Sequence, residues 1–460
     1  MLVNSLAVLK MYLTVILFFV SLLCAHSSEP RPNIILIYVD DMGYGDLSCY
    51  GGELVETPNI DSLAESGIRF TEGYTVSPVC GPSRVGLLTG MQPSRIGVYW
   101  NPDMGAVRVP SGHQTLSELM KSAGYTTALV GKWNLNNPAW NPMPAKRYFD
   151  YVYDEMVWEG DYWPNNNGAY HGVEDGKYGS TKTNDIWGPL KEGDEYLTDR
   201  LSRHACEFIS AQTKQKPFFL YLSYNAPHSP LQGKSEHLSN LSHIDSEPLR
   251  LYASMMLAID EGVGRLLKTL RNNAIREDTV ILFVSDNGPA RTTFKGMPEH
   301  WPRGEMLGST AGLRGYKGTF YEGGVRVPYI LSWPHKIATA IKSNYPVTTL
   351  DIVPTLSSLA GASLDHQQAV DGIDLSPLIS KVPDFMEPRT LLWFAGTSGA
   401  VRNGDWKLVY SRQGESELFN LRTDPMEQVD LSISNSEKYE QMSKFFFDWS
   451  QQVPPPVTPR

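Results

Sequence analysis

The chain has 460 residues, enough for one large domain and a smaller one. Its apolar fraction of 41% and charged fraction of 20% are typical of a globular protein. The formal net charge of −10 argues against a nucleic-acid partner, although a local positive patch could still bind an anion.

The first 28 residues are typical of a secretory signal peptide. Lys10 precedes the apolar run MYLTVILFFVSLLCA, and the small or polar residues AHSSEP follow it. At about 15 residues this run is short for a membrane span. An uncleaved anchor is one alternative, and a lipid on Cys24 is another, disfavoured by the bulky Leu23 before it. We therefore expect an exported mature protein, periplasmic, secreted or in the secretory lumen, without stable membrane insertion.

Strands and helices are predicted to alternate along most of the chain. The β-branched run 33–39 is typical of a strand buried on both faces. The stretch 57–70 has a capping threonine and helical spacing. A helix followed by a strand is then predicted in 115–133, in 197–228 and, with a helix over about 248–273, before DTVILFVSDNGP. This order predicts an α/β fold with a mainly parallel central sheet flanked by helices.

Two regions depart from that alternation. Residues 136–195 are rich in Asn, Pro and rings and are interpreted either as an excursion over the site or as a plain surface loop. Short strands with turns begin near residue 386, and an amphipathic helix is expected over 436–451. We therefore divide the chain into a signal peptide (1–28), a catalytic domain (29–385) and a C-terminal α+β subdomain with an antiparallel sheet (386–460).

Polar side chains follow two of the predicted strands directly. Asp40 and Asp41 end the first strand, and Asp286 and Asn287 end the strand over 279–285. In sheets of this kind the ligand site lies beyond the carboxyl ends of the strands. Four oxygen-bearing side chains meeting there predict a site for a hard divalent cation, calcium or magnesium. Singly, Asp-Asp also fits a strand cap, and Asp-Asn-Gly also fits a turn.

Removal of the signal peptide leaves three cysteines, an odd number for an oxidising compartment: Cys49, Cys80 and Cys206. Cys49 and Cys206 either pair or remain buried thiols. Cys80 stands in SPVCGPSRVGLLTG, one residue before a Pro-Ser-Arg triplet.

The motifs together make the chain resemble the type I sulfatases of the alkaline-phosphatase-like superfamily. They are NIILIYVDDMGYGDLSCYG, TPNIDSLAESGIRFTEGYTVSPVCGPSRVGLLTG, GYTTALVGKW, NAPHSPL, FVSDNGP, GYKGTFYEGGVRVP and NGDWKLVYS followed by LFNLRTDPMEQVDLS. They span nearly the whole mature chain in the order found in that family, and the Cys-x-Pro-Ser-Arg motif is highly specific.

The resemblance implies a chemistry for Cys80. In this family a dedicated formylglycine-generating or sulfatase-maturing enzyme oxidises such a cysteine to formylglycine (3-oxoalanine). One hydroxyl of the hydrated aldehyde attacks sulfur and expels the alcohol, and loss of a proton from the second hydroxyl re-forms the aldehyde and releases sulfate.

The resemblance also implies roles for matched residues. The expected ligands of one Ca²⁺ are Asp40, Asp41, Asp286, Asn287 and the modified Cys80. Arg84 matches the residue that steadies the formylglycine and the metal carboxylates. Lys132, His228 and Lys317 match the groups that bind sulfate, and His228 or Lys317 would protonate the leaving oxygen.

One position departs from the family pattern. Asn134 stands in GKWNLN where the family has a histidine credited with triggering sulfate release, and asparagine is no base near neutral pH. Three interpretations follow. Another histidine serves as the base (His113, His171 or His300); or sulfate is released slowly; or the protein is a degenerate sulfatase that binds sulfated glycans with little turnover.

We expect a sulfated carbohydrate as substrate of this sulfuric ester hydrolase. Rings in the 136–195 segment could stack on sugars or simply pack (Trp140, Trp158, Trp163 and Tyr170), and Lys146 and Arg147 could bind further sulfates or be a solvated turn. Asn240-Leu241-Ser242 is an N-glycosylation sequon. A phosphatase or phosphodiesterase of the same superfamily is the rival hypothesis; such enzymes use a Thr or Ser nucleophile and a second metal site.

Overall fold

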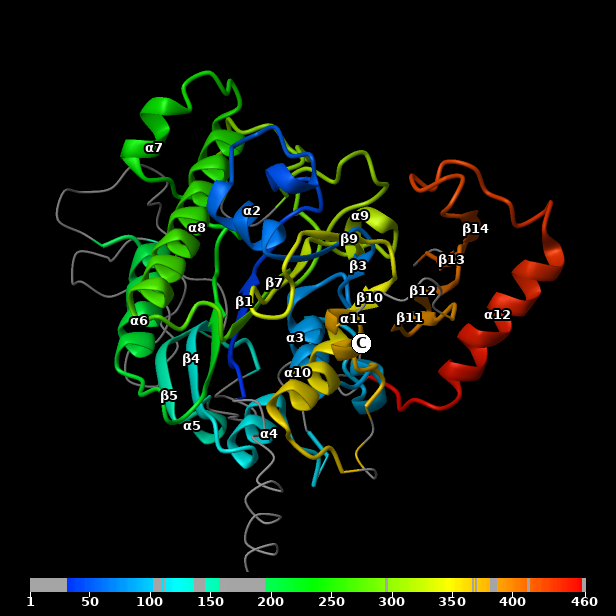
Figure 1. Cartoon of the computed structure of the whole chain (residues 1–460). Helices are drawn as coiled ribbons and strands as arrows, with labels where there is room; N and C mark the ends of the chain where they lie inside the picture. The colour runs from blue at the N-terminus through cyan, green and yellow to red at the C-terminus, as the bar shows by residue number, and fades with distance from the viewer. Residues whose placement is uncertain are drawn as a thin grey trace, which may run out of the picture.

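A large mixed sheet forms the centre of the molecule (Figure 1). The structure, a computed structural model, describes residues 31–101, 109–110, 112–135, 145–156, 162, 195–293, 297–365, 368, 370–380, 387–411 and 414–456. The signal peptide and most of the 136–195 segment lie outside these residues, and with them Trp140, Trp158, Trp163, Tyr170 and His171.

The central sheet has eight strands in the spatial order β5-β4-β6-β1-β7-β8-β2-β9. All neighbouring pairs are parallel except the two made by β8, which runs antiparallel to β7 and β2. The predicted mainly parallel sheet is therefore confirmed. In chain order the strands are β1 (Asn33–Val39), β2 (Gly67–Phe70), β4 (Thr126–Lys132), β5 (Tyr151–Met156), β6 (Phe218–Ser223), β7 (Thr279–Ser285), β8 (Tyr329–Ser332) and β9 (Ile341–Ser343).

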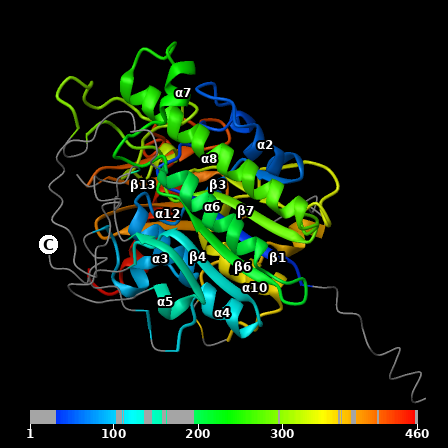
Figure 2. The ribbon, with the colours of Figure 1, turned by 90° about the vertical axis from the view of Figure 1, so that its left-hand side faces the viewer.

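Helices cover both faces of this sheet. Successive residues of β1 enter different cores, because side chains alternate across a strand. Ile35 and Ile37 pack in a core with α2 (Pro58–Glu65), α6 (Leu197–Ser210) and α8 (Glu247–Asn272). Figure 2 shows α6 and α8 lying across that face.

Ile34 and Leu36 face the opposite core. It is built with α3 (Cys80–Thr89), α4 (Leu116–Ser122) and α10 (Ile352–Ala360). Burial on both faces explains why β1 is a continuous apolar run. The remaining short elements of this part are β3 (Gly73–Tyr74), β10 (Val347–Thr348), α5 (Ala145–Tyr148), α7 (Ser235–Asn240), α9 (Glu322–Val325) and α11 (Ser376–Ser380).

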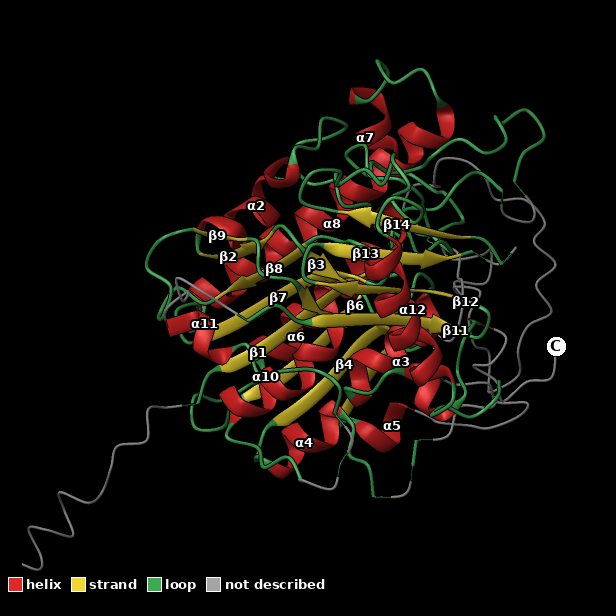
Figure 3. Cartoon of the chain, turned by 90° about the vertical axis from the view of Figure 1, so that its right-hand side faces the viewer, coloured by secondary structure: helices red, strands yellow, loops and turns green. Residues whose placement is uncertain are grey.

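A second, antiparallel sheet follows near the C-terminus, as predicted. Figure 3 shows its four strands with the last helix alongside. They are β11 (Thr390–Ala395), β12 (Ser398–Asn403), β13 (Trp406–Tyr410) and β14 (Ser416–Asn420), and the helix is α12 (Ser436–Ser450). Phe446 of α12 packs with Val401 and Leu408, which places the helix on one face of the sheet.

One expectation needs correction, and one open alternative is decided. Helical spacing was expected across 57–70, but the helix ends at Glu65 and Gly67–Phe70 forms β2. A Cβ on Gly67 would lie 2.1 Å from the Leu331 carbonyl oxygen, so the close approach of β8 requires glycine there. Cys49 and Cys206 do not pair: both are free thiols, and burial raises the pKa of each.

Among the described residues no helix is both long and apolar enough to cross a bilayer. Lys146 and Arg147 are exposed to solvent and lie on the short helix α5.

Candidate active site

The ends of β1 and β7 bring the four predicted metal ligands together. These parallel strands pair in register up to Val39 and Ser285, so the next residues emerge side by side. The Asp41 N–H donates to Asp286 Oδ1 (3.2 Å), and Asn287 Nδ2 donates to Asp41 Oδ1 (2.6 Å). Asp40, Asp41, Asp286 and Asn287 are all buried.

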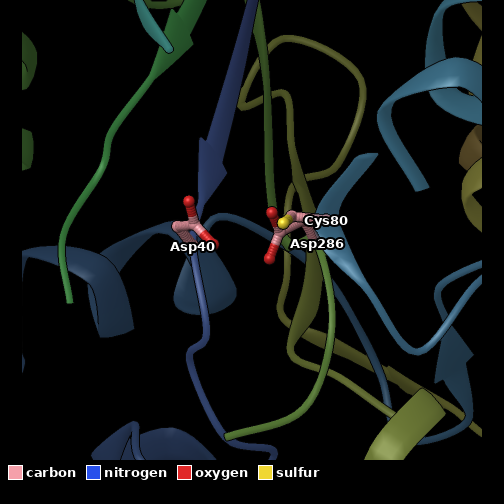
Figure 4. A group of neighbouring side chains, drawn as sticks. All are labelled: Asp40, Cys80 and Asp286. Carbon is pink, nitrogen blue, oxygen red and sulfur yellow. The ribbon is translucent and has the colours of Figure 1, made fainter. Parts of the chain in front are cut away.

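Cys80 reaches the same place from a third segment. It is the first residue of α3, and its sulfur lies with a carboxylate oxygen of Asp40 and one of Asp286 within 4.8 Å of one another. Figure 4 shows the sulfur beside Asp286, with Asp40 next to them at the end of β1. Asp40, Asp41 and His228 form a second, overlapping group of the same kind.

Cationic side chains surround these carboxylates. The guanidinium of Arg84, fully buried on α3, donates to Asp286 Oδ2 (2.8 Å) and to Ser223 Oγ (2.6 Å). Lys132 at the end of β4 binds Asp40 through its ammonium group. Because α3 begins here and β4 ends here, two buried cations meet the acidic pair.

Two further groups approach from loops. Lys317 Nζ lies 2.7 Å from Asp41 Oδ1. His228 Nε2 lies 3.6 Å from Asp41 Oδ2, while its Nδ1 contacts the Ser229 carbonyl oxygen at 2.6 Å. All the expected cationic residues therefore contact the carboxylates of the site.

The close packing of charged groups shifts the pKa values of several side chains in the site. Burial and the neighbouring carboxylates Asp40 and Asp41 raise the pKa of Asp286 to about 7. Burial also opposes the charge on Asp40, but Lys132, His228 and Arg84 outweigh it and lower the pKa of that carboxyl. Burial alone would lower the pKa of Lys317, but the neighbouring Asp41 outweighs burial and raises it.

The donor set fits a hard divalent cation. Among the described residues, Asp40 Oδ1 and Asn287 Oδ1 are buried oxygens without a hydrogen-bond partner. Buried polar atoms are rarely left unpaired, and carboxylate and amide oxygens are the ligands that Ca²⁺ and Mg²⁺ prefer.

Asn134 differs from the other site residues in its side-chain contacts. It is 2% exposed, its φ is 52°, and both side-chain polar atoms lack a partner among the described residues. Asparagine is one of the few residues that adopt this left-handed region readily.

The two described histidines considered as substitutes are engaged elsewhere. His113 Nε2 contacts the Thr89 carbonyl oxygen, at the opposite end of α3 from Cys80, which is about 13 Å along a helix of this length. His300 is exposed and pairs with Glu247 at 2.9 Å. Within the described part of the chain, neither contacts Cys80 or its carboxylates.

Sequence reasoning missed Asn101. Its Oδ1 accepts from the Gly81 N–H (3.0 Å), and its Nδ2 lies 3.4 Å from Cys80 Sγ. Asn101 precedes a proline in a loop, a pattern that indicates only a turn, so no sequence signal singles it out.

Comparison with known proteins agrees with this geometry. The family model described as Sulfatase matches residues 32–362, and the model described as N-sulphoglucosamine sulphohydrolase, C-terminal, matches residues 315–448. The chain is 33% identical over 416 residues to the N-acetylgalactosamine-6-sulfatase of Rattus norvegicus, covering 84% of this chain and 72% of the rat protein. It is 32% identical over 407 residues to arylsulfatase A of Homo sapiens, covering 84% and 76%.

A solved structure is similar over nearly the whole chain. The crystal structure of Ps i-CgsB in complex with k-i-k-neocarrahexaose has a TM-score of 0.78 and 33% identity, and covers 93% of this chain and 94% of that one. Fold and site define a sulfuric ester hydrolase of the alkaline-phosphatase-like superfamily. The chain belongs to the sulfatase family, which the resemblance of its motifs had indicated.

Proposed function

We propose that this protein is an exported sulfatase that hydrolyses sulfate monoesters on carbohydrate, with a formylglycine made from Cys80 as nucleophile. The supporting observation is the Cys80 sulfur, which lies within ligand reach of Asp40 and Asp286 where the two strands end. A maturing enzyme of the exporting cell is the partner that would convert Cys80. The hydrated aldehyde would supply two hydroxyls on one carbon, one to attack sulfur and one to let sulfate leave.

The cation proposed for this site is one Ca²⁺. Its ligands would be Asp40, Asp41, Asp286, Asn287 and the modified Cys80, and it would polarise a sulfate oxygen. The two unpaired buried oxygens, on Asp40 and Asn287, support a cation there. Arg84 holds Asp286 and fixes the direction of that carboxylate.

Three side chains are proposed to bind the sulfate group. Lys132, Lys317 and His228 each contact an aspartate of the site, so their polar ends lie where a bound sulfate would meet the cation. Their positive charge offsets charge developing on the transferred group. His228 or Lys317 would donate the proton that the leaving oxygen needs.

A carbohydrate substrate is supported by the relatives. One is named for N-acetylgalactosamine 6-sulfate, and one structure holds a neocarrahexaose. We assign the chemistry to residues 29–385, and to residues 386–460 a supporting subdomain. Asn134 would slow sulfate release without preventing it.

The proposal is tested by measuring sulfate release from sulfated galactose and N-acetylgalactosamine oligosaccharides. Hydrolysis of an aryl sulfate is compared with hydrolysis of the matching aryl phosphate. The protein should come from a host that makes formylglycine. We expect the sulfate esters to be cleaved in preference to the phosphate, and Cys80→Ala to lose at least about 10³-fold in kcat. Cys206→Ala, which removes a thiol on α6, is the matched control and should keep wild-type activity. Preference for the phosphate ester, or an active Cys80→Ala variant, would contradict the proposal.

A further inference from the structure

The side chain of Asn101 contacts the first turn of α3 at two points. Its Oδ1 accepts the backbone N–H of Gly81 at 3.0 Å, and its Nδ2 lies 3.4 Å from the sulfur of Cys80. The N–H of Gly81 is one of the amides that a helix leaves unpaired at its start, so Asn101 supplies the missing acceptor from a distant loop.

These contacts fix which way the amide of Asn101 faces. A backbone N–H can only donate, so the atom that meets Gly81 must be the carbonyl oxygen. The NH₂ group is then held toward Cys80. The thiol can also point at Oδ1, but at 3.8 Å that contact is the longer one. The Gly81 contact therefore identifies Nδ2–H as the donor to the sulfur, without an arbitrary choice between the two orientations of the amide.

The other donors near Cys80 are committed to carboxylates. Lys132 binds Asp40, Lys317 binds Asp41, and Arg84 binds Asp286. Among the residues that the structure describes, Asn101 is the one whose side chain hydrogen-bonds the sulfur. The side chain of Asn134, which stands where the family has histidine, makes no hydrogen bond within the described chain.

We propose that Asn101 holds the nucleophile: its Nδ2–H donates to the formylglycine oxygen that takes the place of Cys80 Sγ. The sulfur here stands in for one oxygen of the hydrated aldehyde. Held by Asn101, that oxygen keeps the place of the sulfur beside the Asp40 and Asp286 carboxylates, and the rotation of the side chain is fixed. No bond is made or broken at Asn101. This inference rests on the proposed function and extends it to a residue outside the recognised motifs.

Two substitutions separate this role from simple capping of α3. Asn101→Ala removes both contacts. Asn101→Asp keeps an acceptor for the Gly81 N–H, and a carboxylate is favourable at a helix start, but it offers no N–H to the nucleophile. Asn403→Asp is the matched control, because there an amide donates to Thr390 on the C-terminal sheet, away from Cys80.

The kinetic measurement is kcat and KM for an aryl sulfate, expressed per formylglycine determined by peptide mass. We expect kcat to fall about 10- to 100-fold in both Asn101 variants, with KM within threefold, a smaller loss than the about 10²- to 10³-fold for a donor aimed at the reacting oxygen itself. The Asn403→Asp control should match wild type. An Asn101→Asp variant with kcat at or above that of wild type would overturn the assignment, because capping alone would then account for Asn101.

A second readout does not depend on turnover. Methoxyamine labels the free aldehyde but not its hydrate, and one hydrogen bond is worth about 1 kcal/mol. Loss of the Asn101 donor should therefore raise the labelling rate of folded Asn101→Ala about fivefold relative to wild type. An unchanged rate would overturn the inference. Absence of formylglycine from wild type would instead overturn the proposed function, so the two failures are distinguishable.

Discussion

The site takes its residues both from the ends of strands and from loops. Asp40 and Asp286 end buried strands, and parallel strands end at one edge, so their meeting follows from the pattern. Asn101 reaches Cys80 through a loop whose path no local pattern encodes. The motif resemblance marks Asn134 as a departure, but only the folded chain shows that its side chain has no polar partner among the described residues.

Asn134→His should raise kcat by about 10²-fold or more, because general base catalysis is worth about 10²- to 10⁴-fold. The backbone should accept the change: histidine, like asparagine, is enriched at φ values such as the 52° found here. The measurement is steady-state kcat on an aryl sulfate, corrected for formylglycine content.

Asn134→Ala serves as control for the site's packing and should stay within a few-fold of wild type, since it adds no base. If Asn134→His is no faster than wild type, release is not limited by the missing imidazole, and another group already acts as base.

Two strands of the C-terminal sheet, β13 and β14, form ion pairs with the segment that carries Lys317. Arg314, three residues before Lys317, pairs with Glu417 of β14 through both terminal nitrogens, each at 3.1 Å from a carboxylate oxygen. On β13, Lys407 Nζ lies 2.8 Å from Glu322 of α9 and 2.9 Å from Glu427, and all three side chains are fully buried. These ion pairs join the small sheet to the segment between Arg314 and Glu322, which carries Lys317.

Lys407→Met should lower the free energy of unfolding by about 3–5 kcal/mol, because it leaves two buried carboxylates without their shared cation. Lys444→Met is the matched control: its pair with Asp448 on α12 is exposed, and such pairs contribute at most about 1 kcal/mol. Urea unfolding of both variants measures the difference. Equal losses would show that burial does not govern the Lys407 network.

Glu427 gives the same network a pH dependence. Burial raises its pKa from 4.5 to about 7, with a further contribution from Glu322. Between those pH values the folded protein keeps a proton that the unfolded chain releases, so the stability that Glu427 contributes falls as pH rises. Subtracting the unfolding free energy of Glu427→Gln from that of wild type should give a smaller value at pH 8 than at pH 5. A larger value at pH 8 would contradict the assignment.

At the scale of the whole molecule, the layered α/β core and the separate antiparallel sheet could be predicted. Helix α8 was expected over about 248–273 and spans 247–272, and α12 was expected over 436–451 and spans 436–450. Long periodic segments carry their own signal. The antiparallel insertion of β8 and the short strands β2 and β9 were not predicted, because only distant pairing defines them.

The cysteines also show that the contacts of a side chain are defined by the fold and not by the sequence pattern. Counting them left a Cys49–Cys206 disulfide open, and the fold leaves both as free thiols, with Cys206 on α6 and Cys49 packed against the core on that side of the sheet. The odd count is then explained without a disulfide, and Cys80 is set apart by its surroundings: carboxylates, cations and the amide of Asn101.

The proposed chemistry depends on conversion of Cys80 to formylglycine. Its most direct test is the mass of the tryptic peptide Phe70–Arg84, which carries Cys80, from protein made in its native host. We predict the mass of the formylglycine peptide or of its hydrate. A peptide wholly in the cysteine form, from a host that modifies other such motifs, would contradict the account and favour a protein that binds sulfated glycans without hydrolysing them.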